Sequence, residues 1–328
     1  MGKNLQILGI GNAIVDILAR VEDHFISDHN LIKGSMTLVE ADRAAALYES
    51  MPAGREQSGG SVANSVAGIA MLGGRAGYVG KISNDQLGAV FRHDMTANGV
   101  AFDSLPLLDA EPTANCLVAI TPDAERTMNT YLGACSALSM VDINKDQIAD
   151  SEIIYIEGYL WDREHAKQAC RFAMEMAHAS DTKVAFTLSD PFCVDRYRED
   201  FQQLVNGPVD ILFANRDELC SLYQTDDFAD ALKMIEGRVT VAAITCSGDG
   251  AIILAGGERI LVEAVPTAVI DTTGAGDFFA AGFLYGVANG FDLEKAGQLG
   301  AACASLVISQ IGPRPDPAAL KAVLASLE

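Results

Sequence analysis

The seven residues Asp271-Thr272-Thr273-Gly274-Ala275-Gly276-Asp277 combine two carboxylates and two glycines directly before an apolar, helix-forming stretch. Glycines let a backbone turn sharply and approach a ligand, and the first N–H groups of a helix attract anions. A carboxylate in the first helical turn can accept the proton of an attacking hydroxyl during phosphoryl transfer. We therefore predict an anion hole at Gly274, Ala275 and Gly276, with Asp277 as the base. Simple helix capping is the alternative, although it needs only one such residue.

A second glycine pair precedes another helical pattern, in Gly59-Gly60-Ser61-Val62-Ala63-Asn64. Bare backbone at Gly59 and Gly60 lets a polar substrate lie close, and the Asn64 side chain offers both a donor and an acceptor. Sugar hydroxyls need that combination. A glycine pair before a helix is also common in ordinary turns. The pattern therefore indicates a binding site only together with the other motifs.

The N-terminal segment Gly9-Ile10-Gly11-Asn12-Ala13-Ile14 begins like a dinucleotide-binding fingerprint. Ile14 stands in place of the third glycine and no helical pattern follows, which argues against a dehydrogenase. Asp16 lies in an apolar context, where a carboxylate needs hydrogen bonds to offset burial. Two vicinal hydroxyls of a substrate would supply them. An outward-pointing surface position is the alternative.

Polar residues follow two of the predicted strands. Asn215 and Glu218 follow residues 209–214, and the turn that includes Gly248 and Gly250 follows a strand ending at Thr245. Ligands usually bind at the carboxyl ends of parallel strands. Glu218 is a candidate for holding Mg²⁺ through water, while a helix cap explains the same residues equally well. The residues after Thr245 fit either a tight hairpin turn or a nucleotide-lining loop.

Short apolar runs and helical patterns alternate along the chain, which predicts an α/β fold with a doubly wound, mostly parallel sheet flanked by helices. Strands are expected over 5–11, 153–157, 184–188, 209–214, 241–245 and 251–254. Helices are expected over 61–72, 163–179, 276–288 and 293–309. We found no linker or internal repeat, so residues 1–328 are expected to form one principal domain.

Two segments do not fit the alternating pattern, 14–40 and 113–132. Within the second, residues 115–121 and 126–131 resemble the strands of a hairpin. Both segments are expected to form a discontinuous small β lid over the carboxyl ends of the parallel strands. Such a lid would exclude water from the reacting phosphate.

The composition bounds the partners. The 328 residues include 44 acidic and 23 basic side chains, a formal charge of −21, which argues against binding to nucleic acid or to anionic membranes. The 49% apolar content allows a sizeable core. Seven scattered cysteines without metal-ligand spacing are typical of a reducing, cytoplasmic environment, and no export signal or membrane span is evident.

Taken in order and spacing, the glycine pair with Asn64, Asn215 with Glu218, and the motif from Asp271 to Asp277 resemble the ribokinase/PfkB superfamily of carbohydrate and nucleoside kinases. The resemblance covers nearly the whole chain and implies a ribokinase-like fold. Within the superfamily, the chain is most similar to adenosine kinases. The segments that carry this similarity are Gly9–Asn12 with Asp16, Tyr155–Tyr159, Phe186–Phe192 and Val209–Asn215.

The resemblance assigns roles to individual positions. It implies that Asp277 takes the proton of the substrate hydroxyl, that Asp16, Asn64 and the Gly59-Gly60 backbone hold the ribose, and that Asn12 lies nearby. It also implies that Arg126 reaches the phosphates from the lid. The nucleotide would contact Asn215, Thr245, Gly248 and Gly250, and Glu218 would organise Mg²⁺ through water.

The implied reaction is transfer of the γ-phosphoryl of Mg·ATP to the 5′-hydroxyl of adenosine, giving AMP and ADP in purine salvage. ATP and Mg²⁺ are the expected cofactors, K⁺ is an optional monovalent ion, and a monomer and a homodimer are both compatible. Tyr159 offers a π-face to a purine, but Leu160 and Trp161 follow it where many adenosine kinases have further aromatics. Another purine nucleoside or a free sugar such as ribose or fructose is the alternative acceptor. A noncatalytic binding protein is a third alternative.

Overall fold

The computed structural model describes residues 2–123 and 125–327. Its main sheet has eight strands in the order β13-β12-β11-β10-β9-β8-β1-β5. The strands are β1 (Leu5–Ile10), β5 (Ala76–Val79), β8 (Ser151–Glu157), β9 (Lys183–Thr187), β10 (Ile211–Asn215), β11 (Val241–Thr245), β12 (Ala251–Ala255) and β13 (Glu258–Val262). All pairings from β5 to β11 are parallel, and β12 and β13 pair antiparallel. The predicted mostly parallel α/β sheet is thus confirmed.

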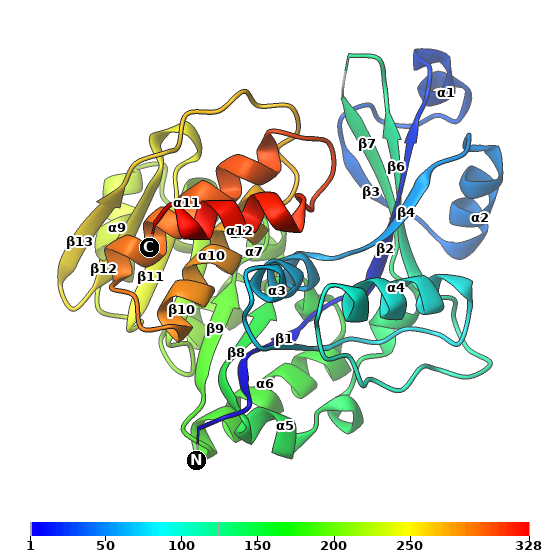
Figure 1. Cartoon of the computed structure of the whole chain (residues 1–328). Coiled ribbons are helices and arrows are strands. Elements are labelled where there is room, and N and C mark those ends of the chain that lie inside the picture. The colour runs from blue at the N-terminus through cyan, green and yellow to red at the C-terminus, as the bar shows by residue number, and fades with distance from the viewer. Residues whose placement is uncertain (1, 124, 328) are drawn as a thin grey trace.

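Helices cover both faces of this sheet (Figure 1). One apolar cluster is built on α3 (Ser61–Met71), α4 (Gln86–Ala97), α10 (Ala275–Ala288), α11 (Leu293–Ile308) and α12 (Pro317–Ala325). The cluster on the other face involves α5 (Lys145–Ala149), α6 (Glu164–Ala179), α7 (Pro191–Val205), α8 (Arg216–Tyr223) and α9 (Phe228–Ile235). Four short 3₁₀ turns are η1 (Gly133–Ala137), η2 (Met140–Asp142), η3 (Gly158–Asp162) and η4 (Ser247–Asp249). Because both faces are covered, the central strands are apolar on both sides.

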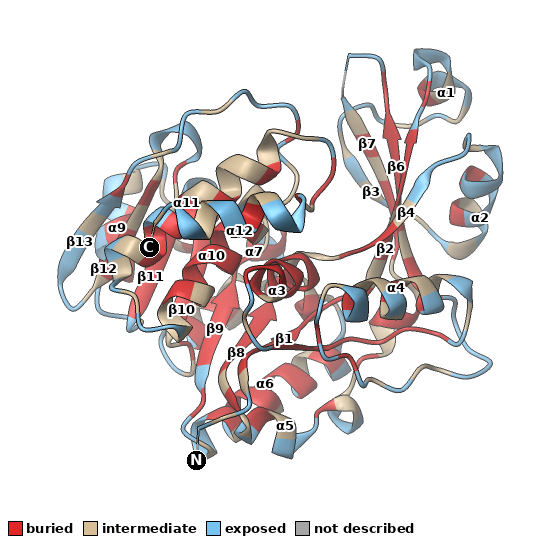
Figure 2. Cartoon of the chain, viewed as in Figure 1, coloured by how far each residue is buried: buried red, intermediate tan, exposed pale blue. Residues whose placement is uncertain are grey.

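Glycines let α10 pack closely between α3 and α11. A Cβ at Gly282 would lie 2.7 Å from the carbonyl oxygen of Leu299, and one at Gly68 would lie 2.9 Å from the Cβ of Ala281. The middle of α10 is buried on all sides, as Figure 2 shows. Its first turn, with Asp277, is therefore held by close helix–helix contacts rather than by a mobile loop.

A second sheet stands apart from the first, at the upper right of Figure 1. Its order is β3-β7-β6-β2-β4, with β2 (Ile14–Arg20), β3 (Met36–Leu38), β4 (Arg55–Gly59), β6 (Ala114–Ile120) and β7 (Arg126–Tyr131). Strands β6 and β7 form an antiparallel hairpin, and α1 (Asp23–Asp28) and α2 (Ala41–Ser50) belong to the same layer. We call this sheet with α1 and α2 the lid layer. Residue 124, within the predicted segment 113–132, lies outside the described residues.

Three strands were not expected from the sequence. The lid strand β4 has the sequence REQSG, which lacks apolar alternation, and it extends the lid layer beyond the two predicted segments. Strand β5 is only four residues long, and β13 is largely exposed at the sheet edge. Each of these strands is defined by its pairing partner more than by its own pattern.

Within the described residues, none of the helices combines the length and apolar character needed to cross a bilayer. All seven cysteines are free thiols, six of them buried.

Candidate active site

A cavity of about 680 Å³ opens at the carboxyl ends of β10 and β11, between these strands and the start of α10. The residues predicted to bind the nucleotide, Asn215, Thr245, Gly248 and Gly250, all line it. Ala275, Gly276 and Asp277 line it as well, together with Ser61 from α3. The two glycine motifs of the sequence therefore meet at one end of this cavity.

Asp277 lies where the first turns of two helices meet. Its Oδ1 accepts a hydrogen bond from the Ser61 hydroxyl at 2.7 Å, and its Oδ2 accepts one from Asn64 Nδ2 at 3.0 Å. Burial raises the pKa of Asp277 to about 6, while the two hydrogen bonds and the positive charge of Arg314 oppose that rise. A carboxylate with such a pKa is ionised at neutral pH and still basic enough to accept a proton.

The predicted anion hole forms the start of α10. Gly274 is the residue before the helix and has φ 81°, a left-handed conformation that favours glycine. The N–H of Ala275 donates to the Thr272 carbonyl at 3.2 Å. Among the described residues, no side chain or main-chain carbonyl accepts a hydrogen bond from the N–H groups of Gly274 and Gly276. Two of the three predicted amides are thus available to an anion, and the third is engaged in the turn.

Asn215 and Glu218 form a reciprocal cap at the start of α8. The Glu218 carboxylate accepts from the Asn215 N–H at 3.0 Å and from Asn215 Nδ2 at 2.7 Å, and the Glu218 N–H donates to Asn215 Oδ1 at 2.8 Å. Burial raises the pKa of Glu218 to about 7. Both residues line the cavity, so the Glu218 carboxylate caps α8 and also lies where a ligand could reach it.

Asn12 lies at the end of β1 and is tied to Glu157 at the end of β8. Its backbone N–H and its Nδ2 donate to Glu157 Oε1 at 2.9 and 2.8 Å. The other oxygen of Glu157 accepts from the Val62 N–H at 3.0 Å. Burial raises the pKa of Glu157 to about 7. One buried carboxylate therefore joins two strands of the sheet to the start of α3.

Asp16 faces the glycine pair from the neighbouring lid strand. A Cβ at Gly59 would lie 2.3 Å from Asp16 Oδ2, so the carboxylate rests against bare backbone. Asp16 accepts no hydrogen bond from any described residue, and burial raises its pKa to about 6. Gln57, its register partner on β4, is buried, and its Nε2 has no partner among the described residues. Gly60 has φ 97° and begins α3.

Arg126, on lid strand β7, reaches the first residue of the anion motif. Its Nη1 donates to Asp271 and to the Thr273 hydroxyl. Asp271 also accepts from the N–H groups of Gly312 and Thr273 at 2.8 and 3.0 Å. Although burial acts in the opposite direction, the bonds from Arg126, Gly312 and Thr273 hold the pKa of Asp271 below its usual range. The lid layer is thereby ionically linked to the loop that precedes α10.

Tyr159 lies in η3, just after β8. Its hydroxyl donates to the Ser189 carbonyl at 3.3 Å, and its ring packs against the core on the α6 side of the sheet. It is not among the residues that line the large cavity. Its predicted contact with a purine stays a prediction.

Four side chains of this site had no role in the sequence prediction: Ser61, Gln57, Glu157 and Arg314. Arg314 donates to Asn64 Oδ1 at 3.2 Å and to Asp94 at 3.1 Å. Glu157 had a usable signal, because it is an acidic residue at the end of an apolar strand. Arg314 follows a long uncharged segment and lies far from the other motifs in the sequence, so only the folded chain shows its place.

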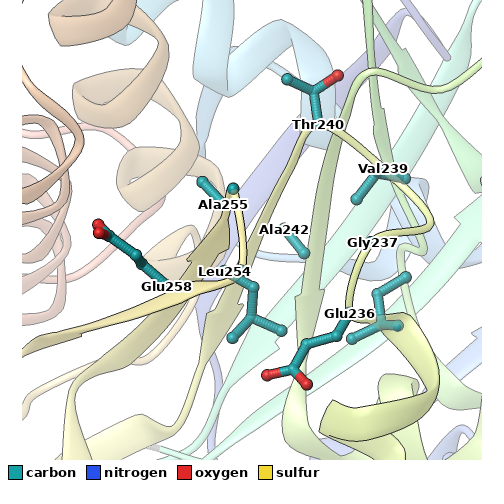
Figure 3. A pocket seen from close by; sticks show the side chains of 11 residues that line it. Glu236, Gly237, Val239, Thr240, Ala242, Leu254, Ala255 and Glu258 are labelled. Carbon is teal, nitrogen blue, oxygen red and sulfur yellow. The ribbon is translucent and has the colours of Figure 1, made fainter.

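A second cavity, of about 370 Å³, lies at the opposite end of β11 (Figure 3). Glu236, Thr240 and Glu258 are among the residues around it, with Gly256 and Gly257 from the β12–β13 turn. None of the described residues lining it is a lysine or an arginine. It contains none of the predicted site residues and lies at the other end of β11 from the cavity that Asp277 lines.

Comparison with known proteins agrees with this geometry. Residues 34–319 match the model of the pfkB family of carbohydrate kinases. The 5-dehydro-2-deoxygluconokinase of Geobacillus thermodenitrificans is 28% identical over 265 residues, covering 76% of this chain and 78% of that protein.

Two solved structures resemble the whole chain. An adenosine kinase from Sinorhizobium meliloti is 49% identical with a TM-score of 0.91, covering 98% of this chain and 99% of that one. A probable sugar kinase protein from Rhizobium etli CFN 42 is 48% identical with a TM-score of 0.93, covering 99% and 100%. With the family match extending over most of its length, this chain belongs to the pfkB family of carbohydrate kinases, which acts on sugars and nucleosides.

Proposed function

We propose that this kinase transfers the γ-phosphoryl group of Mg·ATP to the 5′-hydroxyl of adenosine, giving AMP and ADP. The observation that carries the proposal is the position of Asp277, between the large cavity on one side and the first turn of α3 on the other. The carboxylate can take the proton of an acceptor hydroxyl while the amides at the start of α10 stabilise the transferring phosphoryl.

The acceptor would bind between the lid layer and α3. Asp16 and Gln57 present polar atoms that no described residue satisfies, beside the bare backbone of Gly59 and Gly60. Two vicinal hydroxyls donating to Asp16 would stabilise its ionised form, which burial disfavours. Asn12, held by Glu157, would border this site.

The donor nucleotide would occupy the large cavity, in contact with Asn215, Thr245, Gly248 and Gly250. Both oxygens of Glu218 are engaged by Asn215, so Mg²⁺ fits there through its water shell and not by direct ligation. No group of three potential ligands occurs among the described His, Cys, Asp and Glu residues, so phosphate oxygens and water would supply the other ligands. Bound Mg²⁺ would neutralise developing charge on the phosphates.

Adenosine is favoured over a free sugar by the 49% identity to an adenosine kinase across almost the whole chain. The 48% identity to a probable sugar kinase protein, also across almost the whole chain, and the 28% identity to a 5-dehydro-2-deoxygluconokinase support the alternative, a kinase of a free sugar or sugar acid. The two candidates differ in the acceptor and share the base, the anion hole and the donor cavity.

An acceptor panel tests the proposal directly. ADP formation would be measured with ATP and Mg²⁺ against adenosine, inosine, guanosine, ribose, fructose and 5-dehydro-2-deoxygluconate. We expect kcat/KM for adenosine to exceed that for each free sugar by at least about 100-fold, because a free sugar lacks the purine and its binding energy in the transition state. A free sugar as the best acceptor would replace the adenosine assignment, and no ADP with any acceptor would overturn the kinase proposal for these compounds.

A further inference from the structure

Arg314 lies in the loop between α11 and α12, and its guanidinium contacts residues next to the acceptor site. Its side chain is 5% exposed. Nε donates to Asn64 Oδ1 on α3 at 3.2 Å, and Nη1 donates to Asp94 Oδ2 on α4 at 3.1 Å and to the Ser58 hydroxyl on β4. A single side chain thus joins two helices and the lid strand that carries Gly59.

The contact with Asn64 determines which way its amide faces. A guanidinium offers donors only, so the atom of Asn64 next to Arg314 Nε must be the oxygen. The NH₂ group is then directed to Asp277 Oδ2, 3.0 Å away. Arg314, Asn64 and Asp277 form a chain of hydrogen bonds in which each donor is fixed by the one before it.

The charge of Arg314 acts on the same carboxylate. The ionisable groups that interact with it are Asp16 of β2, Asp94 of α4, Asp277 of α10 and Tyr78 of β5. Burial lowers the pKa of Arg314, while Asp94, Asp16 and Asp277 oppose that change. Burial raises the pKa of Asp277, and Asn64, Ser61 and Arg314 oppose that rise. Arg126 of β7 is the other cation that lowers the pKa of Asp16.

We propose that Arg314 is a positioning residue for phosphoryl transfer. Its guanidinium holds Asn64 with the NH₂ group on Asp277, and through Ser58 and Asp94 it fixes β4 against α4. One side chain thereby supports both the base, which Ser61 also holds, and the glycine floor of the acceptor site, which Ser58 also ties to Asp94. The inference rests on the proposed function, because it takes Asp277 as the base.

Two variants separate the charge from the forked geometry. Arg314→Met removes both, whereas Arg314→Lys keeps a cation and loses the parallel donors. We expect kcat to fall about 100-fold in the Met variant and about tenfold in the Lys variant, within the range of a misplaced proton acceptor. KM for ATP is expected to change less than about twofold, because the donor cavity lies on the other side of Asp277.

The pH profile provides a reading that a purely structural role would not produce. In wild type, kcat/KM for the acceptor should fall below a pH of about 6 as Asp277 and Asp16, each with a pKa of about 6, become protonated. In Arg314→Met this acidic limb should move upward by at least about half a pH unit, since an opposing cation is gone. In Arg314→Lys the limb should move less. Arg259→Met, which removes a surface arginine paired with Glu236, is the matched control and should behave as wild type.

Specific outcomes decide between the alternatives. A folded Arg314→Met enzyme with unchanged kcat and an unmoved acidic limb would overturn the inference. If that variant does not fold, an Arg314→Lys enzyme with wild-type kcat would overturn it equally, because lysine cannot reproduce the fork. Asp277→Asn is assayed in parallel: near-normal activity there would reject the base assignment itself, whereas loss there with unaffected Arg314 variants would reject only the role of Arg314.

Discussion

The two halves of the site are built in different ways. The proposed donor half is a cavity at the ends of β10 and β11, lined by glycines, apolar side chains and an Asn–Glu cap. The acceptor half lies against the lid layer and depends on buried ionisable groups that come from separate parts of the chain, among them Asp16, Glu157 and Arg314. The donor half can thus be recognised from short local motifs, whereas the acceptor half forms only when distant segments of the chain come together.

Asp277 belongs to both halves, so its replacement should have the largest effect. We expect Asp277→Asn to lower kcat by about 10³-fold, within the range for loss of a general base. The neutral amide removes a buried charge, so the melting temperature should change by only a few degrees. Circular dichroism and single-turnover kinetics would measure the two quantities. If Asp277→Asn turned over within fivefold of wild type, Asp277 would not be the base. The comparison of the two halves would then lose the residue that joins them.

In the donor half, Gly276→Ala should separate activity from stability. A Cβ at Gly276 meets no atom within 4 Å, and the residue lies in the first turn of α10. Alanine favours a helix by up to about 1 kcal/mol over glycine, so the melting temperature should hold or rise. The added methyl group occupies the space next to the amide that would bind the phosphoryl, and kcat should fall about 30-fold, in line with a displacement of about 1 Å. Lower stability with intact activity would contradict this account.

In the acceptor half, Gly59→Ala should have the opposite pattern. Its Cβ would lie 2.3 Å from Asp16 Oδ2, so the carboxylate or the strand must move. We expect a stability loss of about 1–3 kcal/mol, as for overpacked sites. KM for the nucleoside should rise about tenfold, the effect of about 1.4 kcal/mol of lost binding, while KM for ATP stays unchanged. Equal effects on the two KM values would show that the halves are not independent.

The smallest expected effect is that of Glu218→Gln. Glutamine keeps an acceptor oxygen for the Asn215 N–H but places an NH₂ group against Asn215 Nδ2, so the variant maintains the capping box, loses one hydrogen bond and removes the charge. We expect the Mg²⁺ concentration for half-maximal activity to rise about threefold, consistent with contact through water. An unchanged Mg²⁺ requirement would indicate that Glu218 caps α8 and takes no part in Mg²⁺ binding.

The same variant has a defined pH signature in stability. Burial raises the Glu218 pKa from 4.5 to about 7, so the folded state holds its proton more tightly than the unfolded state. Below pH 4.5 the carboxyl is protonated in both states and does not lower the free energy of unfolding. As the pH rises to 7, it lowers the free energy of unfolding progressively. The melting temperature of Glu218→Gln minus that of wild type should increase between pH 5 and 8. A difference independent of pH would show that Glu218 titrates normally.

Sequence patterns were sufficient for six of the eight strands of the main sheet and for the residues that line the large cavity at the ends of β10 and β11. The runs before Asn215 and Thr245 are apolar on both faces, and the glycines of the anion motif lie next to the base in the chain, so local chemistry fixes their relative position. The hairpin of β6 and β7 followed from alternation and turn spacing in the same way.

The acceptor half could not be predicted to the same extent. Strand β4 has no apolar pattern and forms because it pairs with β2, which places Gln57 opposite Asp16. Arg314 and Asn64 are 250 positions apart, and no local pattern indicates that they meet. Glu157 has a local signal as an acidic residue that ends an apolar strand, but its partners Asn12 and Val62 follow only from the fold. Contacts of this kind depend on topology, not on periodicity.

The ion pair between Arg126 and Asp271 has a consequence for the order of events. Nη1 of Arg126 is shared between Asp271 and Thr273. If a polyphosphate recruited this nitrogen, as the proposed function implies, it would compete with both acceptors, and nucleotide binding and release of the ion pair would be one exchange reaction. The carboxylate set free then keeps its bonds from the Gly312 and Thr273 amides, which preserve the loop while the arginine changes partners. A stronger ion pair would slow nucleotide binding, whereas a weaker one would hold the lid layer less firmly. The strength of this pair would therefore balance nucleotide binding against closure of the site.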